Sequence, residues 1–373
     1  MIYKKAIKLY ALIMLCVLLL PSCEESVNSS ESEENSIQLF SSEVSETEAS
    51  VYESEEISFS ASEDVSTEPS EAPSEESEES VEESSELSSE DAELSYDPSY
   101  SEITIDSAGE RYADKFTDGE IISDESSYKS KFINVTYKEI NFEGKLYFVQ
   151  DIYIKDIECL SVGFAGLKFG KKYNDYVYDM VNDYRESGVN VIGAVNGDYC
   201  GLNGKGAIIR NGKLYGTGIP DYSVCVLYKN GVMAVIEKNL FNAEKELERG
   251  AWHVWDFGPS FLNSDGSPVE KFTEKISISR GNPRTAIGYF EPGHYCFVVA
   301  GGRATENAYG VSFVQISRFL SNLGCKVGYN LDGGKSSVMV FGDKISNEKY
   351  QGTGRRISDI VFVKDISEEA SVQ

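Results

Sequence analysis

A long acidic segment near the N-terminus most constrains what this 373-residue chain can fold into. Residues 24–97 contain 26 acidic side chains and neither Lys nor Arg, and Ser is the other common residue there. A Ser/Glu-rich segment poor in aromatic residues cannot bury enough apolar surface to offset its loss of conformational entropy. We therefore expect residues 24–100 to be a disordered, charge-extended spacer. Its strong negative charge argues against nucleic acid as a partner.

The chain beyond the spacer is nearly balanced in charge. From Ser101 onward it has 31 basic and 36 acidic residues, so most of the formal net charge of −28 belongs to the spacer. This part is long enough to bury a sizeable hydrophobic core. We expect a polar, irregular lead-in over residues 101–131, a folded domain over 132–365 and a polar tail over 366–373.

The first 23 residues have the features of an export signal. Lys4, Lys5 and Lys8 precede an apolar run that is too short to span a membrane comfortably. The run ends in Leu20-Pro21-Ser22-Cys23, which resembles a bacterial lipoprotein box. We expect Cys23 to be lipidated and to anchor the chain to the membrane. The alternative is a plain secretory signal with an incidental cysteine, and on either interpretation the protein works outside the cytoplasm.

Five cysteines remain beyond the N-terminal segment, and none has C-x-x-C spacing. With only two histidines in the chain, a zinc site built from Cys and His is not expected. We interpret these cysteines mainly as buried small apolar residues, with one disulfide as an alternative. They are Cys159, Cys200, Cys225, Cys296 and Cys325.

Hydrophobic periodicity and turn residues predict an α+β fold: a mixed β-sheet with several hairpins and a few packed helices in a single domain. Asn-Gly pairs at 211–212 and 230–231 are typical of hairpin turns. Residues 252–266, which hold both tryptophans, are predicted to be loop-rich. The predicted strands include 132–140, 145–154, 189–195, 283–290, 294–300, 326–331 and 357–363, and the predicted helices are 174–187, 241–250 and 311–323.

Three loops are expected to meet at one edge of the sheet. A strand at 295–300, a helix at 311–323 and a strand at 326–331 suggest a crossover between parallel strands, which brings Arg303 and Asp332 to the same edge. The strand at 189–195 likewise leads to Asp198, and ligands in such sheets favour the crevice beyond strand ends. The resulting cleft suits a polar, anionic or sugar-like substrate. The alternative for the Asp-Gly-Gly of this region is an ordinary turn.

Four motifs occur together in order. They are Asn-Gly-Asp-Tyr at 196–199, Asp-Phe-Gly-Pro-Ser-Phe-Leu at 256–262, Pro-Arg-Thr-Ala-Ile-Gly at 283–288 and Asn-Leu-Asp-Gly-Gly-Lys-Ser-Ser at 330–337. Their combination resembles the phosphodiester glycosidase family over about residues 132–365. The chain departs from the family pattern at Lys335, where a third glycine is common, and at Gln315, where an acidic residue is common.

The resemblance implies a hydrolase that cleaves the sugar to phosphate linkage of glycosyl 1-phosphodiesters, such as those of N-acetylglucosamine in cell-envelope or host glycans. Asp332 and Asp198 would share the carboxylate work of catalysis. Arg284 and Arg303 would bind the phosphate, for which the planar guanidinium is well matched. The remaining substrate-binding candidates are Asn196, Gly197, Thr285, Gly333, Gly334, Ser336 and Ser337.

Several alternatives stay open at this point. Asp198 and Asp332 could instead coordinate Ca²⁺ through oxygen, although no metal site is assigned. His253 and His294 are expected to be structural. Trp252, Trp255 and Tyr199 could stack on a sugar ring, although buried aromatic residues are the commoner case. The competing functions are a non-catalytic glycan-binding envelope lipoprotein involved in exopolysaccharide assembly, and a structural adhesin on a stalk.

Overall fold

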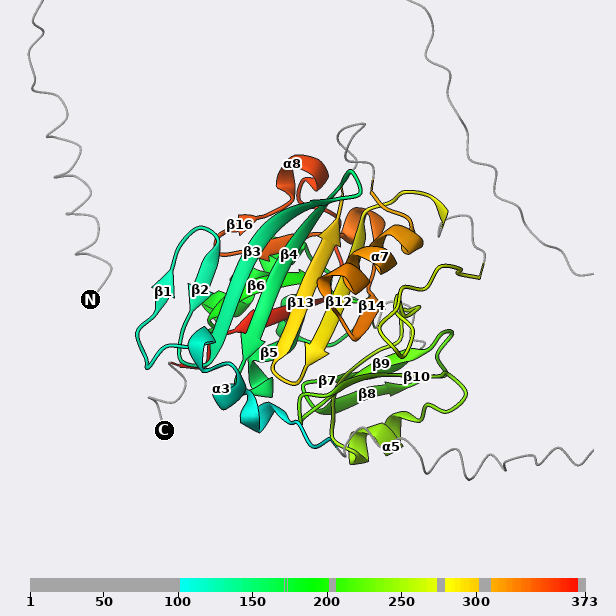
Figure 1. Ribbon diagram of the computed structural model, residues 1–373, viewed down its shortest axis with the longest axis horizontal. Helices are drawn as coiled ribbons and strands as arrows, with labels where there is room; N and C mark the ends of the chain where they lie inside the picture. The colour runs from blue at the N-terminus through cyan, green and yellow to red at the C-terminus, as the bar shows by residue number, and fades with distance from the viewer. Residues whose placement is uncertain are drawn as a thin grey trace, which may run out of the picture. The chain divides into compact units, whose positions relative to one another are not determined.

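The computed structural model of the protein describes residues 101–170, 172, 174–200, 206–273, 279–301 and 310–367 (Figure 1). The expectations for the export signal, for lipidation at Cys23, for the spacer 24–100 and for Arg303 lie outside these residues. In the described part, no helix is both long enough and apolar enough to cross a membrane.

Three antiparallel sheets form the framework. The seven-stranded sheet has the order β1-β2-β3-β4-β13-β12-β14, and the two five-stranded sheets have the orders β10-β9-β11-β7-β8 and β16-β15-β6-β17-β5. The strands of the first sheet are β1 (Ile122–Ser123), β2 (Ser127–Lys129), β3 (Ile133–Phe142), β4 (Lys145–Ile154), β12 (Arg284–Glu291), β13 (His294–Ala300) and β14 (Val327–Asn330). Those of the second are β7 (Ala207–Arg210), β8 (Lys213–Thr217), β9 (Val224–Tyr228), β10 (Met233–Ile236) and β11 (Ala251–Trp255). Those of the third are β5 (Leu160–Phe164), β6 (Val191–Asn196), β15 (Met339–Phe341), β16 (Lys344–Ile345) and β17 (Asp359–Lys364).

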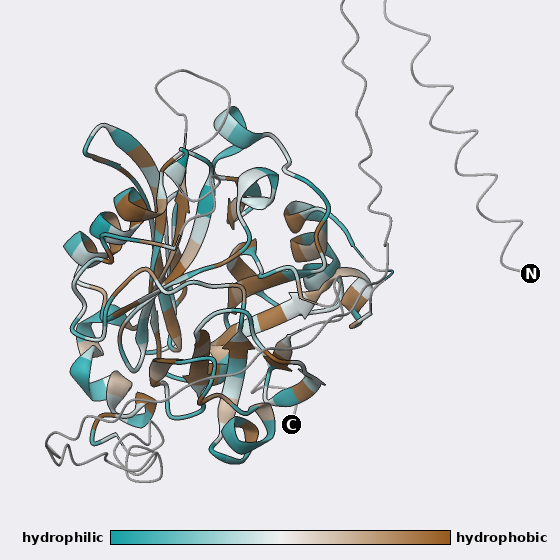
Figure 2. Ribbon diagram, turned by 90° about the vertical axis from the view of Figure 1, so that its right-hand side faces the viewer, coloured by the Kyte–Doolittle hydropathy of each residue, from teal (hydrophilic) through white to brown (hydrophobic). Residues whose placement is uncertain are grey.

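Each sheet has a helix packed on one face. Helix α7 packs with residues of β4, β12 and β13, α4 with residues of β6 and β17, and α5 with the second sheet. The main core cluster holds the facing residues of all three sheets. Figure 2 shows the hydrophobic residues concentrated on the strands between these layers. The α-helices are α3 (Ala108–Arg111), α4 (Val177–Glu186), α5 (Ala243–Glu248), α7 (Phe313–Leu323) and α8 (Glu348–Gln351).

Strand β13 illustrates how the sequence specifies two faces. Tyr295, Phe297 and Val299 belong to the main core, whereas the alternating residues Cys296 and Val298 face the cluster that contains α7. Because successive side chains of a strand point to opposite faces, one apolar strand contributes to both layers. This explains why the segment is apolar without interruption.

The α+β class is confirmed, but the mixed sheet is not. Strands β13 and β14 run in the same direction on either side of the α7 crossover, as predicted, yet they are not neighbours. Strand β12 lies between them and pairs antiparallel with both. The hairpin partner of β13 thus fills the gap that the crossover leaves, and the first sheet has no parallel pair among its described residues. The named pairings of the other two sheets in the described part are also antiparallel.

The segment 101–131 is less irregular than expected. It contains short helices and the strands β1 and β2, and β2 pairs with β3. Ile105 and Ala108 are buried in the main core cluster. Residues 252–255, expected to begin a loop-rich segment, belong to β11 in the middle of the second sheet, where all its residues except Trp252 are buried. Strands β5 and β15 were not expected from the sequence.

Helix α7 ends at Leu323 as predicted, but it begins at Phe313, two residues later than predicted. Ser312 and Gln315 form a reciprocal capping box, and Gly324 adopts φ 88° at the C-cap, where a left-handed backbone favours glycine. Gln315 thus has a structural task that needs no carboxylate. The five cysteines of the described part are buried and form no disulfide, and the sulfur atoms of Cys296 and Cys325 are 3.8 Å apart.

Candidate functional site

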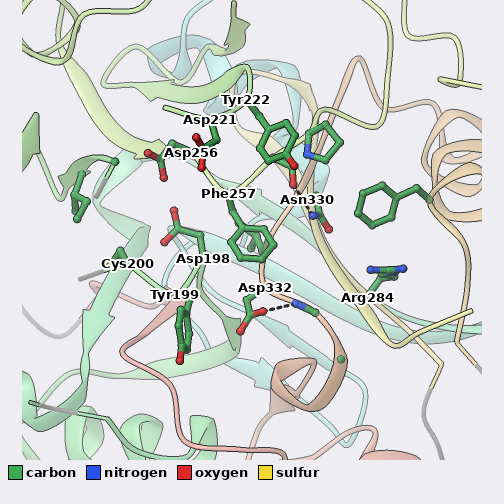
Figure 3. A pocket seen from close by; sticks show the side chains of 18 of the residues that line it. Asp198, Tyr199, Cys200, Asp221, Tyr222, Asp256, Phe257, Arg284, Asn330 and Asp332 are labelled. Carbon is green, nitrogen blue, oxygen red and sulfur yellow. Dashed lines mark hydrogen bonds between the residues drawn. The ribbon is translucent and has the colours of Figure 1, made fainter. Parts of the chain in front are cut away.

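A pocket of about 800 Å³ opens where several strands end (Figure 3). Asp198 follows β6, Asp256 follows β11, Asp332 follows β14, and Arg284 begins β12, which runs antiparallel to β14. The structure places all four side chains in the lining of this one pocket. The other lining residues are Tyr199, Cys200, Gly206, Ile208, Ile219, Asp221, Tyr222, Phe257, Gly258, Pro259, Asn282, Phe313, Asn330, Leu331, Gly333 and Gly334.

Backbone hydrogen bonds tie the three motif loops together. The Asp332 amide donates to the Gly197 carbonyl at 3.2 Å, the Leu331 amide to the Thr285 carbonyl at 2.9 Å, and the Gly334 amide to the Pro283 carbonyl at 2.8 Å. Each bond joins residues far apart in sequence. The positions of the pocket side chains are therefore set by the sheet framework rather than by local loop structure.

Asp198 forms a buried ion pair with Arg210 of β7. Nη2 of Arg210 donates to Oδ1 of Asp198 at 2.6 Å and lies 3.7 Å from Oδ2 of Asp359. Both Arg210 and Asp359 are fully buried. Burial and the charge of Asp198 raise the pKa of Asp359 above its ordinary value, against the opposing charge of Arg210. Two carboxyl groups thus share one buried guanidinium, and Oδ2 of Asp198 is buried without a hydrogen-bond donor among the described residues.

Gly197 allows this cluster to form. A Cβ atom at this position would lie 2.2 Å from Oδ2 of Asp359, far closer than atoms can approach. The Gly197 amide also donates to the Asp359 carbonyl at 2.8 Å. Glycine is required here because β6 and β17 bring their ends together at the base of the pocket.

Asp332 is held by three donors. Its Oδ1 accepts from the Gly333 amide at 2.8 Å, and its Oδ2 accepts from the Ser336 hydroxyl at 2.5 Å and from Nη2 of Arg355 at 2.7 Å. Nε of Arg355 also donates to the Ser336 hydroxyl at 2.6 Å. Both oxygens of Asp332 are thus engaged, so its carboxylate is fixed in position.

Asn196 and Thr285 brace the site from below instead of lining it. The side-chain Nδ2 of Asn196 donates to the Asp332 carbonyl at 2.7 Å, and its side-chain Oδ1 accepts from the Thr285 hydroxyl at 2.7 Å. Both residues are fully buried and outside the pocket lining. Ser336 and Ser337 are also fully buried and outside the lining, whereas Gly333 and Gly334 belong to it. Lys335 is exposed.

Arg284 lies across the pocket from the Asp198 side (Figure 3). Its Nε donates to the Val311 carbonyl at 3.2 Å, and its guanidinium lies 4.4 Å from the centroid of the Phe313 ring. Burial lowers its pKa to about 10, so it remains a cation at neutral pH. A partly desolvated, planar guanidinium held by an aromatic ring can donate two hydrogen bonds to an anion such as phosphate.

Aromatic side chains line the space between Asp198 and Arg284. Phe257 lies between them in Figure 3, with Tyr199 and Tyr222 on either side. Tyr199 adopts φ 66°, an uncommon conformation for a residue other than glycine, and the Arg355 guanidinium lies 5.2 Å from its ring centroid. These rings can stack on the apolar face of a sugar.

The two tryptophans and two histidines have structural positions. Trp255 is fully buried in the core, and the Trp252 indole donates to the Leu160 carbonyl at 2.9 Å. His253 is fully buried, and burial lowers its pKa to about 3. His294 contacts Oδ1 of Asp151 at 2.7 Å and stacks on Tyr153. None of the four lines the pocket.

One group of side chains has the composition of a metal site. The ligand atoms of Asp198, Cys200 and Asp359 lie within 4.8 Å of one another. Arg210 already presents its positive charge to both carboxyl groups of this set. Its guanidinium therefore compensates the negative charge of these carboxyl groups, as a bound cation would.

Four functional candidates were missed by the sequence analysis: Arg210, Asp256, Arg355 and Asp359. Asp256 opens a motif that the analysis singled out, and Arg210 is a charged residue at the end of an apolar strand, β7. Such a residue signals a buried partner, since a lone buried charge is costly. Arg355 and Asp359 carry no comparable signal, because only the tertiary structure brings them to Asp332 and Arg210.

Comparison with one solved structure supports the fold. The zebrafish N-acetylglucosamine-1-phosphodiester alpha-N-acetylglucosaminidase catalytic domain, auto-inhibited by its pro-peptide, aligns with a TM-score of 0.50 at 17% identity, over 67% of this chain and 86% of that one. A protein from Synechocystis aligns with a TM-score of 0.48 at 13% identity, over 62% of each chain. No curated protein sequence matches the chain.

The family comparison covers the part of the chain that builds the pocket. The model of the phosphodiester glycosidase family matches residues 189–364, which include β6, β7, β11, β12, β14 and β17. Every pocket residue discussed above lies within this range. Residues 189–364 of the chain therefore resemble the phosphodiester glycosidase family.

Proposed function

We propose that this pocket hydrolyses the sugar to phosphate linkage of glycosyl 1-phosphodiesters, with N-acetylglucosamine-1-phosphodiester-like glycans as the substrate class. The observation that supports this most is the placement of carboxyl groups and Arg284 in the lining of one pocket. A glycan-binding surface needs aromatic and amide groups, but it does not need this separation of negative and positive charge.

The chemistry requires both the acidic side of the pocket, at Asp198, and the opposite side, at Arg284. Breaking the bond between the anomeric carbon and the phosphate oxygen develops positive charge on the sugar and negative charge on the departing phosphate. On the acidic side, Asp198 carries the buried oxygen that has no donor, and it can stabilise the cationic sugar. On the other side, Arg284 can hold the phosphate. Asp332, fixed by Arg355 and Ser336, supplies the second carboxylate of the pocket.

The neighbouring loops hold the substrate in this proposal. Gly333 and Gly334 line the pocket, so backbone atoms can approach the phosphate closely there. Tyr199, Tyr222 and Phe257 can stack on the sugar ring. Asn196 and Thr285 fix the loops through their mutual hydrogen bond and thereby position Asp332.

The test is sugar release by the purified protein from an N-acetylglucosamine 1-phosphodiester. The proposal predicts free sugar with the wild type, a strong loss with Asp198→Asn, and wild-type release with the surface variant Arg318→Met. Thermal unfolding of each variant shows whether it is folded. Binding without release by the wild type would instead support the glycan-binding function, and neither binding nor release would reject both.

We also propose that the domain works outside the cytoplasm on a lipid anchor at Cys23, with the acidic spacer setting its reach. The basic, apolar and Cys-terminated pattern of residues 1–23 supports this. Mass spectrometry of the mature N-terminus tests it. A lipidated Cys23 at the N-terminus is the expected result, and an unmodified residue other than Cys23 there rejects the anchor.

A further inference from the structure

Asp256 is a pocket carboxyl that the proposed function has not used. It follows β11, and its Oδ2 accepts a hydrogen bond from the Ala207 amide at 2.8 Å. The backbone of Gly206 packs so closely that a Cβ there would lie 2.1 Å from the same oxygen. The carboxyl is thus held by backbone at the end of a buried strand, with its side chain in the pocket lining.

Besides the exposed Asp221, three acidic residues line the pocket, and they differ in their partners. Asp198 is paired with Arg210, and Asp332 is paired with Arg355. Among the ion pairs between described residues, none includes Asp256, and the group that donates to its Oδ2 is the neutral backbone amide of Ala207. A carboxylate that is clamped by a guanidinium is a poor proton acceptor, because protonation would break a charge-assisted pair. The contact pattern therefore separates Asp256 from the other two.

The surroundings of Asp256 also favour its role as a proton acceptor, because they raise its pKa. Burial is the largest effect and, with the nearby negative charges of Asp198 and the exposed Asp221, raises its pKa to about 7. The Ala207 amide and the Arg210 guanidinium oppose the shift. The hydroxyl of Tyr329, buried behind the same wall, has its pKa raised by burial and stays neutral. A base that titrates near the working pH is efficient in proton transfer.

We propose that Asp256 is the general base that activates water in the proposed hydrolysis, while Asp198 stabilises the sugar cation. This inference rests on the proposed function. In the step, a water oxygen forms a bond to the anomeric carbon and the water proton passes to Asp256. The bond from the anomeric carbon to the phosphate oxygen breaks, and its electron pair leaves on the phosphomonoester. Asp256 then returns the proton to solvent.

The role assigned to Asp332 changes accordingly. Its two oxygens already accept from Gly333, Ser336 and Arg355, so it serves as the fixed negative charge of the pocket rather than as the group that exchanges a proton. Asp256 reaches the pocket from the second sheet, whereas Asp332 comes from the first. The proposed reaction thus depends on how these two sheets are joined.

The experiment is the pH dependence of kcat/KM for an N-acetylglucosamine 1-phosphodiester, measured with the wild type, Asp256→Asn and Asp256→Ala. The wild type should show a rising limb with a midpoint near pH 7, which is the pKa of the base. Asp256→Asn should lose this limb and at least about a hundredfold in kcat/KM, the usual range for a general base. Sodium formate should restore part of the activity of Asp256→Ala, since it can fill the space of the missing carboxyl.

A matched control is Glu270→Gln, which removes an exposed carboxylate that pairs with Arg318 on the surface. It should keep both the rate and the limb. A folded Asp256→Asn variant with the wild-type rate and limb overturns the inference and leaves the proposed hydrolase intact. A wild type that releases no sugar overturns the proposed function, and the inference with it. Activity of Asp256→Ala that formate does not raise also counts against the base.

Discussion

Arg210 and Asp198 form an ion pair of 2.6 Å between two side chains that are almost completely removed from solvent. The arginine comes from β7 and the aspartate follows β6, so the pair joins two different sheets. Buried charges in such surroundings are stable only when each is compensated. The pair therefore both holds the sheets together and keeps a negative charge at the base of the pocket.

Replacing Arg210 should strongly lower the stability of the domain. Arg210→Met leaves Asp198 and Asp359 buried without their shared cation, and breaking a buried pair in this way costs about 3–5 kcal/mol in the free energy of unfolding. Urea unfolding at pH 7 measures it. Arg318→Met is the matched control, because Arg318 and Glu270 are 45% and 50% exposed. It should cost at most about 1 kcal/mol. Equal losses for the two variants would contradict the structural role of Arg210.

Arg284 should act on the phosphate and not on the sugar. Arg284→Met should lower kcat/KM for a phosphodiester substrate by about 10- to 150-fold, which corresponds to the loss of a hydrogen bond to a charged group. A neutral aryl glycoside of the same sugar should be affected much less. The ratio of the two effects is the measurement. If both substrates lose activity equally, Arg284 has only a structural function.

Asp332 should be required for turnover. The domain should still fold when its carboxylate is replaced by a neutral amide. Asp332→Asn keeps an oxygen for the Gly333 amide but removes the charge that pairs with Arg355. We expect kcat for a glycosyl 1-phosphodiester to fall at least about a hundredfold, because the pocket loses a negative charge beside the developing cation. Circular dichroism checks that the variant is folded. Wild-type rates in a folded variant reject this assignment.

The pKa of Asp256 gives a stability signature. Its folded-state pKa of about 7 lies above the ordinary value of 3.8, so the folded protein binds more protons than the unfolded chain between these pH values. The stabilisation from this group is therefore complete below about pH 4 and is lost as pH rises to about 7. Asp256→Asn removes this titration. Its stability relative to the wild type should rise by on the order of 1–3 kcal/mol from pH 4 to pH 8, less than the full shift because the side chain is partly exposed.

Urea unfolding across the pH range measures this difference. The control is Glu270→Gln, whose exposed carboxylate has a pKa lowered by its hydrogen bond to Arg318. That variant should show a small trend of the opposite sign. A difference between Asp256→Asn and the wild type that stays constant with pH would show that Asp256 has the same proton affinity in both states.

The strand ends were predictable from the sequence because each apolar run has a clear boundary. The chain passes from β6, which ends at Asn196, into Gly197 and Asp198, and from β14, which ends at Asn330, into the Asp332 loop, each within one residue of the predicted strand end. The hairpin β3–β4 follows from its strand pattern and turn in the same way. Arg284 and Asp332 meet at the pocket because β12 runs antiparallel to β14, so the start of one strand lies beside the end of the other. Asp198 reaches the same pocket from the end of β6, in another sheet.

What the sequence could not provide is the partner of each charge. Arg210 is 12 residues from Asp198, whereas Asp359 is separated from both by more than half of the folded part. Pairing between sheets determines which carboxyl groups share a cation, and no local pattern encodes that. The same limit applies to Asn196 and Thr285, because their exposure depends on the residues packed around them. Both are polar residues of site motifs, yet both are buried and hydrogen-bonded to each other instead of lining the pocket.

The most direct test of the central claim is which bond of the phosphodiester breaks. The purified protein is incubated with an N-acetylglucosamine 1-phosphodiester in oxygen-18-labelled water, and the released phosphomonoester is examined by phosphorus NMR. Attack of water on the anomeric carbon predicts a phosphomonoester that contains no label. Label in the phosphomonoester, which reports attack on phosphorus, would contradict the account.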